Sequence, residues 1–205
     1  LSPEGKRDPR AEMEATLQAF FRKPAEGQIA AGFKFIARLD WLSKKLDIDK
    51  SRLPDDYLKR FDDFYSSLDP ANVILVFPAG YVDSPASMFG HTLLVLEKSG
   101  ENRLVAQAVN YAAKTTDTFG PTFAFKGVFG IYRGYYSFMP YFEKITEYSD
   151  GEMRDMWEYR LNLSEEEKRR LVMHMVEMED IGSRYFFFDE NCSYNLLFLL
   201  DAARP

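Results

Sequence analysis

The spacing of apolar residues changes abruptly near residue 69, and this change restricts the possible folds more than any other feature of the chain. Before it, apolar residues recur at helical spacing within residues 9–22, 33–42 and 54–68. After it, the run Asn72–Phe77 is rich in β-branched residues and bounded by turn residues, which is typical of a buried strand. We therefore predict an α+β protein, with an N-terminal helical lead-in over residues 1–69 and a sheet-containing part over residues 70–205, packed as one compact unit.

The residues after position 90 predict a β-hairpin. Two mainly apolar stretches, 91–97 and 104–110, flank the polar turn 99–102. Further strands are expected within the segment 119–148, which is rich in glycine and aromatic residues, and at residues 157–161. Together these strands predict an antiparallel sheet.

Two helices are predicted in the C-terminal part of the chain. Ser164, followed three residues later by Glu167, forms a capping box that opens the first of them. The second begins near Asn191 and is almost wholly apolar through Leu200, so we expect it to be buried. The antiparallel sheet is expected to pack on this last helix.

Charge and missing motifs exclude several classes of function. A net charge of -6 lacks the basic surface that phosphate neutralisation requires, so no nucleic acid is expected as a partner. No apolar run approaches the ~20 residues that span a bilayer. The sequence has no G-x-S-x-G nucleophile elbow, no glycine-rich nucleotide loop and no zinc-ligand spacing, so we expect no metal and no cofactor. Because the chain starts without Met and stops just after a helix, we expect a mature or trimmed form of a longer precursor.

Cys192 is the only thiol, and it lies at the predicted start of the last helix. Asp189 and Asn191 are the candidate N-caps of that helix. Unpaired backbone N–H groups and the helix dipole at such a position favour the thiolate and lower the pKa of a cysteine. Cys192 is therefore the candidate nucleophile, and its own N–H with a second one from the helix start is the candidate oxyanion hole.

A thiol nucleophile needs a base, and the chain has two histidines. His91 opens the predicted hairpin directly after Met88-Phe89-Gly90, whereas His174 lies on an apolar helical stripe and resembles a packed core residue. The return strand of the hairpin is expected to bring Asn110, or failing that Gln107, beside His91 as the residue that orients the imidazole. We therefore predict a Cys192, His91 and Asn110 catalytic set.

The order of these residues along the chain carries information about the fold. In the papain plan a cysteine at a helix N-terminus faces a strand histidine, but here the histidine comes first. This order predicts a circularly permuted papain-like catalytic domain over residues 70–205.

Several short stretches resemble known families. The stretch Asn191–Tyr194, followed by an apolar helix and preceded by a Gly-His strand, resembles the permuted NlpC-type group that includes lecithin:retinol acyltransferase. A closer similarity, over roughly residues 30 to 205, is to the Lnb family of bacterial lipoprotein N-acyltransferases. It is carried by the stretches Leu75–Gly80, Ser87–Thr92, Ala108–Ala112, Tyr132–Tyr136 and Phe187–Tyr194.

The resemblance implies a periplasmic enzyme of the bacterial cell envelope. Such an enzyme takes an acyl chain from a phospholipid onto its cysteine and transfers it to the free α-amino group of a lipoprotein, which implies association with a membrane surface. Among the residues in these motifs, Tyr136, Asn191 and Tyr194 are expected to contact substrate. Two alternatives stay open: a cysteine hydrolase, either a peptidoglycan amidopeptidase or a lipase, using the same Cys-His pair, and a non-catalytic module that binds lipid or a partner.

Overall fold

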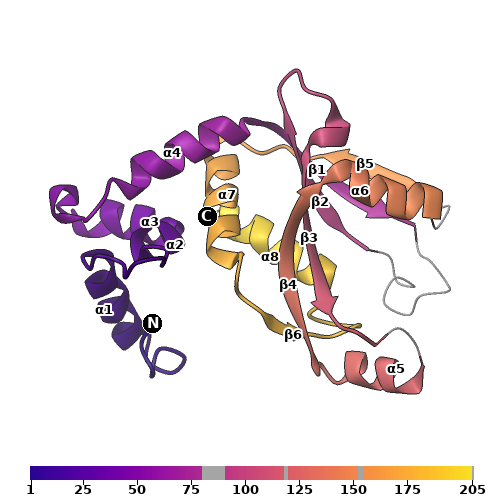
Figure 1. Ribbon diagram of the computed structural model, residues 1–205, viewed down its shortest axis with the longest axis horizontal. Coiled ribbons are helices and arrows are strands. Elements are labelled where there is room, and N and C mark those ends of the chain that lie inside the picture. The colour runs from indigo at the N-terminus through magenta and orange to yellow at the C-terminus, as the bar shows by residue number, and fades with distance from the viewer. Residues whose placement is uncertain (80–90, 118–119, 152–154, 205) are drawn as a thin grey trace. The chain divides into compact units, whose positions relative to one another are not determined.

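The structure is a computed structural model that describes residues 1–79, 91–117, 120–151 and 155–204. The chain divides into two compact units, Leu1–Ser67 and Leu68–Pro205 (Figure 1). This division falls two residues before the boundary suggested by the sequence. Each unit is described by itself.

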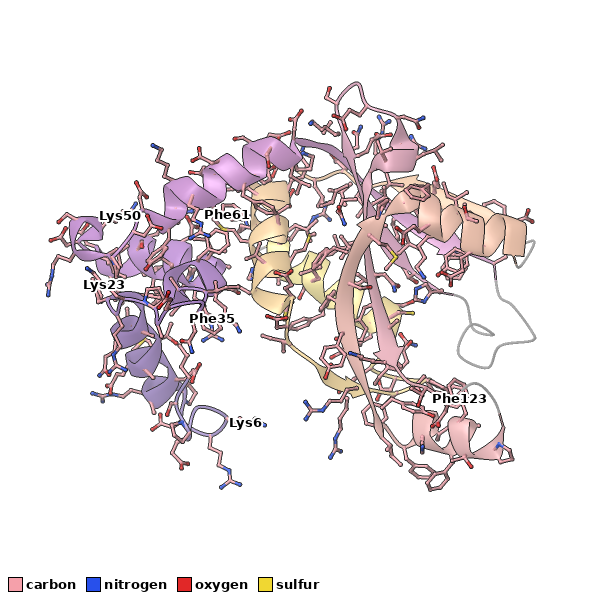
Figure 2. All side chains as sticks on the ribbon, viewed as in Figure 1. Lys6, Lys23, Phe35, Lys50, Phe61 and Phe123 are labelled. Carbon is pink, nitrogen blue, oxygen red and sulfur yellow. The ribbon has the colours of Figure 1, made fainter. Side chains whose placement is uncertain are left out.

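The N-terminal unit is helical. Its core is formed by apolar side chains from the first, third and fourth helices, with Phe61 of the last helix among the fully buried ones (Figure 2). Gly32 is required by this packing, because a Cβ there would lie 2.2 Å from the Tyr57 ring. The last helix begins at Tyr57, three residues after Pro54, where the sequence suggested its start. The helices are α1 (Pro9–Phe20), α2 (Ala31–Lys34), α3 (Ile36–Leu46) and α4 (Tyr57–Leu68), with the 3-10 turn η1 (Lys50–Arg52).

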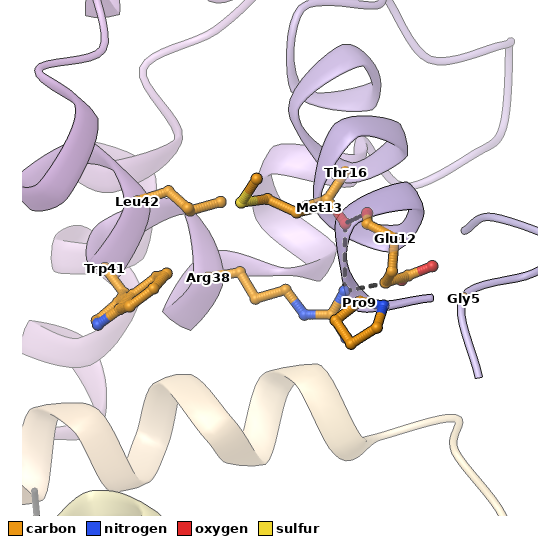
Figure 3. A pocket seen from close by; sticks show the side chains of 8 residues that line it. All are labelled: Gly5, Pro9, Glu12, Met13, Thr16, Arg38, Trp41 and Leu42. Carbon is orange, nitrogen blue, oxygen red and sulfur yellow. Dashed lines mark hydrogen bonds and ion pairs between the residues drawn. The ribbon is translucent and has the colours of Figure 1, made fainter. Parts of the chain in front are cut away.

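The N-terminal unit has a hollow of about 340 Å³ between α1 and α3 (Figure 3). Arg38 crosses it and donates to Glu12 at 3.0 Å and to Thr16 at 3.3 Å. The remaining walls are mostly apolar, including Met13 and Trp41. The charged groups of this hollow are therefore paired with each other.

The second unit contains a six-stranded sheet in the described residues, with the order β5-β1-β2-β3-β4-β6. Every neighbouring pair is antiparallel. The predicted α+β class with an antiparallel sheet is thus confirmed. The strands are β1 (Pro70–Pro78), β2 (Leu93–Lys98), β3 (Gln107–Lys114), β4 (Tyr132–Pro140), β5 (Met156–Arg160) and β6 (Ser183–Tyr185).

Along the chain, the helices of the second unit alternate with these strands, and α8 follows the last of them. The capping box of α7 is confirmed: Ser164 Oγ accepts from the Glu167 N–H at 3.3 Å, and the Glu167 carboxylate accepts from the Ser164 N–H at 2.7 Å. The strand expected within the aromatic segment 119–148 is present as β4, and the rest of the described segment is mainly helical. The elements are η2 (Arg103–Val105), α5 (Pro121–Val128), α6 (Tyr141–Ile145), the π-helical turn η3 (Thr146–Gly151), α7 (Glu165–Met178) and α8 (Cys192–Ala203).

Helix α8 packs against β2, β3 and α7. Leu196 and Leu199 face this contact and are buried, whereas Leu197 and Phe198 are more than half exposed. The prediction that the whole helix is buried is therefore wrong, because the sheet and α7 cover only part of its circumference. Within the described residues, no helix has both the length and the apolar content that a bilayer-spanning segment needs.

Candidate active site

The start of α8 holds Cys192 in a defined position. Asn191 is the N-cap: its Oδ1 accepts from the Tyr194 N–H at 3.2 Å, and its Nδ2 donates to the Phe187 carbonyl at 3.3 Å. Asp189, the other candidate cap, instead accepts the Asn191 N–H with its backbone carbonyl at 2.7 Å. Cys192 is consequently the first residue of the helix.

The hairpin brings His91 and Asn110 together. His91 lies two residues before β2, and Asn110 lies in β3 opposite Leu93. The His91 Nε2 atom is 2.5 Å from Asn110 Oδ1. Gln107, the alternative orienting residue, pairs with Leu96 at the other end of the strand contact. Of the two candidates, Asn110 is therefore the one that contacts the imidazole.

This contact determines which nitrogen of His91 carries the proton. An amide Oδ1 can only accept, so Nε2 is the donor and Nδ1 keeps its lone pair in the neutral ring. The amide of Asn110 is held in this orientation because its Nδ2 donates to Ser137 Oγ at 3.4 Å. His91 thus has one nitrogen fixed and one nitrogen free to accept a proton.

The start of β2 is joined to the start of α8. Thr92 Oγ1 lies 2.6 Å from Ser193 Oγ across 101 residues of sequence. His91 and the Thr92 backbone also act on the Cys192 side chain, because both lower the pKa of its thiol. The thiol and the imidazole, which the sequence predicted as partners, are therefore neighbours.

The pKa of Cys192 results from opposed effects. Burial, with only 3% of the residue exposed, raises the pKa of the thiol. The hydrogen bond and the charge of His91, the Thr92 backbone and the Tyr185 side chain together outweigh burial and lower the pKa to about 7. A substantial fraction of Cys192 is then thiolate at neutral pH, which is the form that reacts as a nucleophile.

Tyr185 is a site residue that sequence reasoning missed. It belongs to the aromatic run before the cysteine, and its ring stacks on Tyr111 with centroids 5.8 Å apart. Burial, followed by the negative charge of Cys192, raises the pKa of Tyr185, so its hydroxyl stays protonated and can donate toward the sulfur. The available signal was a run of four aromatic residues that ends four positions before the candidate nucleophile.

Tyr136, one of the predicted substrate residues, supports α8 from the sheet. Its hydroxyl donates to the Asn195 carbonyl at 2.8 Å, and its ring meets Tyr111 edge to face at 4.8 Å. Burial raises the pKa of Tyr136, which keeps the hydroxyl protonated as this donor. Its predicted contact with substrate stays a prediction, as does that of Asn191, whose side chain caps the helix.

Tyr194 is the predicted substrate residue with a free surface. It is the third residue of α8, and 49% of it is exposed. The turn Met88-Phe89-Gly90, expected to precede the histidine, lies outside the described residues.

His174 differs from its prediction as a packed core residue. Its side chain is 25% exposed, and Nδ1 lies 3.5 Å from the Glu177 carboxylate one turn along α7. The expectation of a fully packed ring is wrong, because the apolar stripe of α7 runs beside this position. Across the described parts of the chain, no group of three or more His, Cys, Asp or Glu side chains is arranged to hold a metal ion.

The first turn of α8 also offers backbone donors. The N–H of Tyr194 is taken by the cap, and that of Asn195 donates to the Asn191 carbonyl at 3.1 Å. The N–H groups of Cys192 and Ser193 precede these and have no acceptor within a helix. They are suited to an oxygen that gains negative charge during attack by the sulfur.

Comparisons with known proteins match two parts of the chain. The family model described as the Lnb N-terminal periplasmic domain matches residues 60–205. A second model, a domain of unknown function (DUF7843), matches residues 1–45. No curated protein and no solved structure matches the chain.

Proposed function

The chain belongs to the family of Lnb N-terminal periplasmic domains and is a periplasmic domain, and on this premise we propose that it is a cysteine-dependent acyltransferase. The proposed reaction moves an acyl chain from a phospholipid, through a thioester on Cys192, to the N-terminal amine of a bacterial lipoprotein. One observation carries the proposal: a thiol with a pKa of about 7 beside a histidine whose other nitrogen is held 2.5 Å from Asn110.

In the first stage the Cys192 thiol loses its proton to His91 Nδ1, and the sulfur attacks the carbonyl carbon of a phospholipid ester. The carbonyl oxygen becomes negative and is stabilised by the N–H groups of Cys192 and Ser193. Collapse of this intermediate breaks the ester C–O bond. The imidazolium then gives its proton to the departing lysophospholipid oxygen, leaving a thioester and neutral His91.

In the second stage the lipoprotein amine attacks the thioester carbonyl. His91 takes a proton from the attacking nitrogen, the C–S bond breaks, and the proton returns to the Cys192 sulfur. The products are an amide and the free thiol. Asn110 acts as a positioning residue throughout, because its Oδ1 keeps the Nε2 proton in place and leaves Nδ1 for catalysis.

We infer a papain-like arrangement of permuted order from the same residues. Three observations support it: the nucleophile opens a helix packed on an antiparallel sheet, the histidine precedes one strand, and the orienting amide lies on the adjacent strand. His91 comes before Cys192 in the chain, as permutation requires.

The decisive experiment is intact-mass measurement after incubation with a detergent-dispersed phospholipid. We expect a mass increase of one acyl group in the wild-type chain and none in Cys192→Ala or His91→Ala. His174→Ala is the matched control, since it removes the other histidine, which lies on α7 beside Glu177. This variant should form the adduct normally. An adduct that persists in Cys192→Ala, or none in the wild type, would overturn the proposal.

The acceptor separates the transferase from a hydrolase with the same dyad. We expect acylated wild-type protein to lose its adduct faster when a peptide with a free N-terminal S-diacylglyceryl cysteine is added, with an amide-linked acyl group appearing on the peptide. Release of the chain only as free fatty acid would instead identify water as the acceptor. A peptide with an acetylated N-terminus is the control and should accept nothing.

A further inference from the structure

Helix α5 has apolar residues on both of its sides. The inner side packs in the second unit: Phe123 contacts Phe187 with ring centroids 5.1 Å apart, and it lies on the side of α5 turned toward the strands (Figure 2). Gly127 is the point of closest approach, because a Cβ there would lie 2.3 Å from the Phe187 ring. The inner side of α5 thus packs against the segment that follows β6.

The outer side of α5 is apolar and uncovered. Phe125 is 57% exposed and Phe129 is 60% exposed, and their rings lie 4.5 Å apart. Val128 and Ile131 are also exposed. We call these four residues the α5 patch. Clustered exposed apolar side chains of this kind mark an interaction surface.

A row of three cations crosses the strands next to α5. Lys114 of β3 is opposite Arg133 of β4, and Arg133 is opposite Arg184 of β6. Residues directly opposite in an antiparallel sheet project from the same face, where like charges repel each other. All three side chains are exposed, and within the described residues none of them forms an ion pair. We call them the basic row; its charge is unusual in a chain of net charge -6.

The α5 patch and the basic row are at the same end of the sheet. α5 connects the end of β3 to the start of β4, so Lys114 and Arg133 flank it along the chain, and Figure 1 shows it where β4 begins. The segment after β6 is joined to α5 as well, because the Phe187 N–H donates to the Gly127 carbonyl at 3.0 Å. Lys126 of α5 adds little free charge, since it pairs with Asp117 at 2.7 Å.

We propose that the α5 patch and the basic row dock this domain on a bilayer that contains anionic phospholipid. The aromatic rings enter the boundary between headgroups and acyl chains, and the three cations contact phosphate groups. Charge complementarity selects this partner. The cations of the basic row match anionic headgroups, and the adjacent α5 patch matches the acyl chains beneath them. The inference rests on the proposed function, because the bilayer on which the domain docks contains the phospholipid that donates the acyl chain.

The test is flotation of the full chain with vesicles. Vesicles of equimolar phosphatidylglycerol and phosphatidylcholine should bind the protein, and pure phosphatidylcholine should bind it far less. The double variant Arg133→Gln with Arg184→Gln should weaken binding to the anionic vesicles by about 25-fold, because each cation removed should weaken it about fivefold. Phe125→Ser with Phe129→Ser should weaken binding at least tenfold to either vesicle.

Matched controls come from equally exposed residues elsewhere. Trp157→Ser removes an aromatic side chain that is 56% exposed on β5, and Lys45→Gln removes an exposed cation of α3. Neither should change flotation by more than twofold. Equal effects of patch and control variants, equal binding to both vesicles by the wild type, or binding to soluble polyglutamate in preference to vesicles would each overturn the docking proposal. Should the phenylalanine pair fail to fold, the surface arginine pair carries the test.

The docking and catalytic proposals fail separately. If flotation depends on the patch and the row but detergent-dispersed phospholipid gives no adduct on Cys192, docking stands and catalysis fails. If the adduct forms in detergent while the patch variants float like the wild type, catalysis stands and docking fails. Cys192→Ala should float normally under the docking proposal.

Discussion

The surroundings of the two histidines differ in a way that shows what a catalytic imidazole requires. His91 is buried, its Nε2 contacts the Asn110 amide, and it lowers the pKa of the Cys192 thiol. His174 lies on one helix, is partly exposed, and has the Glu177 carboxylate 3.5 Å away within the same helix. A base needs one nitrogen fixed so that the other faces the reacting proton, and only the first region provides that.

The largest expected effect compares alanine substitutions of the two histidines. His91→Ala should reduce the rate of adduct formation on Cys192 by about 10³-fold, since it removes both the base and the partner of the thiolate. His174→Ala should stay within twofold of the wild type. Mass spectrometry of samples quenched at successive times measures the rate of adduct formation in each variant. Comparable losses of rate in the two variants would contradict the assignment of His91 as the base.

The next effect concerns the residue that fixes the ring. Asn110→Ala should slow adduct formation by about 10²-fold, because His91 loses the contact that selects its tautomer and orientation. Gln107→Ala, in the same strand, should have little effect. The pH profile separates positioning from folding: Asn110→Ala should flatten the rise in rate near pH 7, while its melting temperature changes little.

The pH dependence of Cys192 alkylation tests whether His91 lowers the pKa of the thiol. Alkylation of Cys192 by iodoacetamide should rise with a midpoint near pH 7 in the wild type, following the lowered pKa of the thiol. In His91→Ala the midpoint should move to higher pH, because the hydrogen bond and the positive charge that favour the thiolate are gone. A midpoint that is the same in the wild type and His91→Ala would contradict the assigned cause.

The lowered pKa of Cys192 also predicts that the stability of the protein increases with pH. Because the folded pKa of about 7 is below the ordinary value of ~8.5, the unfolded chain binds more protons between these two pH values. The free energy of unfolding should therefore rise by about 2 kcal/mol from pH 6 to pH 9.5, relative to Cys192→Ala. Urea unfolding followed by tryptophan fluorescence measures this difference, and no pH-dependent difference would count against the lowered pKa.

The smallest effect concerns the support of α8. Tyr136→Phe removes the hydroxyl that donates to the Asn195 carbonyl at 2.8 Å, and should reduce the free energy of unfolding by about 1 kcal/mol. Tyr194→Phe changes an exposed hydroxyl on the same helix and should leave stability unchanged. Thermal unfolding of both variants tests whether the first tyrosine acts structurally.

Sequence reasoning was most successful where neighbouring residues decide the structure. The α7 capping box, the strand after Asp69 and the helix start at Cys192 depend on spacings of a few residues, and each was predictable. The exposed outer face of α8 was not, because an apolar pattern does not say how many sides of a helix are covered. Within the aromatic segment the expected strand is present as β4, whereas helix α5, which presents part of the segment to solvent, was not predicted.

By itself, the sequence determined that a lone cysteine opens a helix and that a histidine stands before a strand, since capping and strand formation are local. Only the tertiary structure decided that Asn110 rather than Gln107 meets His91, and that Tyr185 joins the thiol. Those contacts depend on strand register and on the docking of α8 across 101 residues, as the Thr92 to Ser193 hydrogen bond shows. Register and docking follow from packing of the whole unit, which no short stretch of residues specifies.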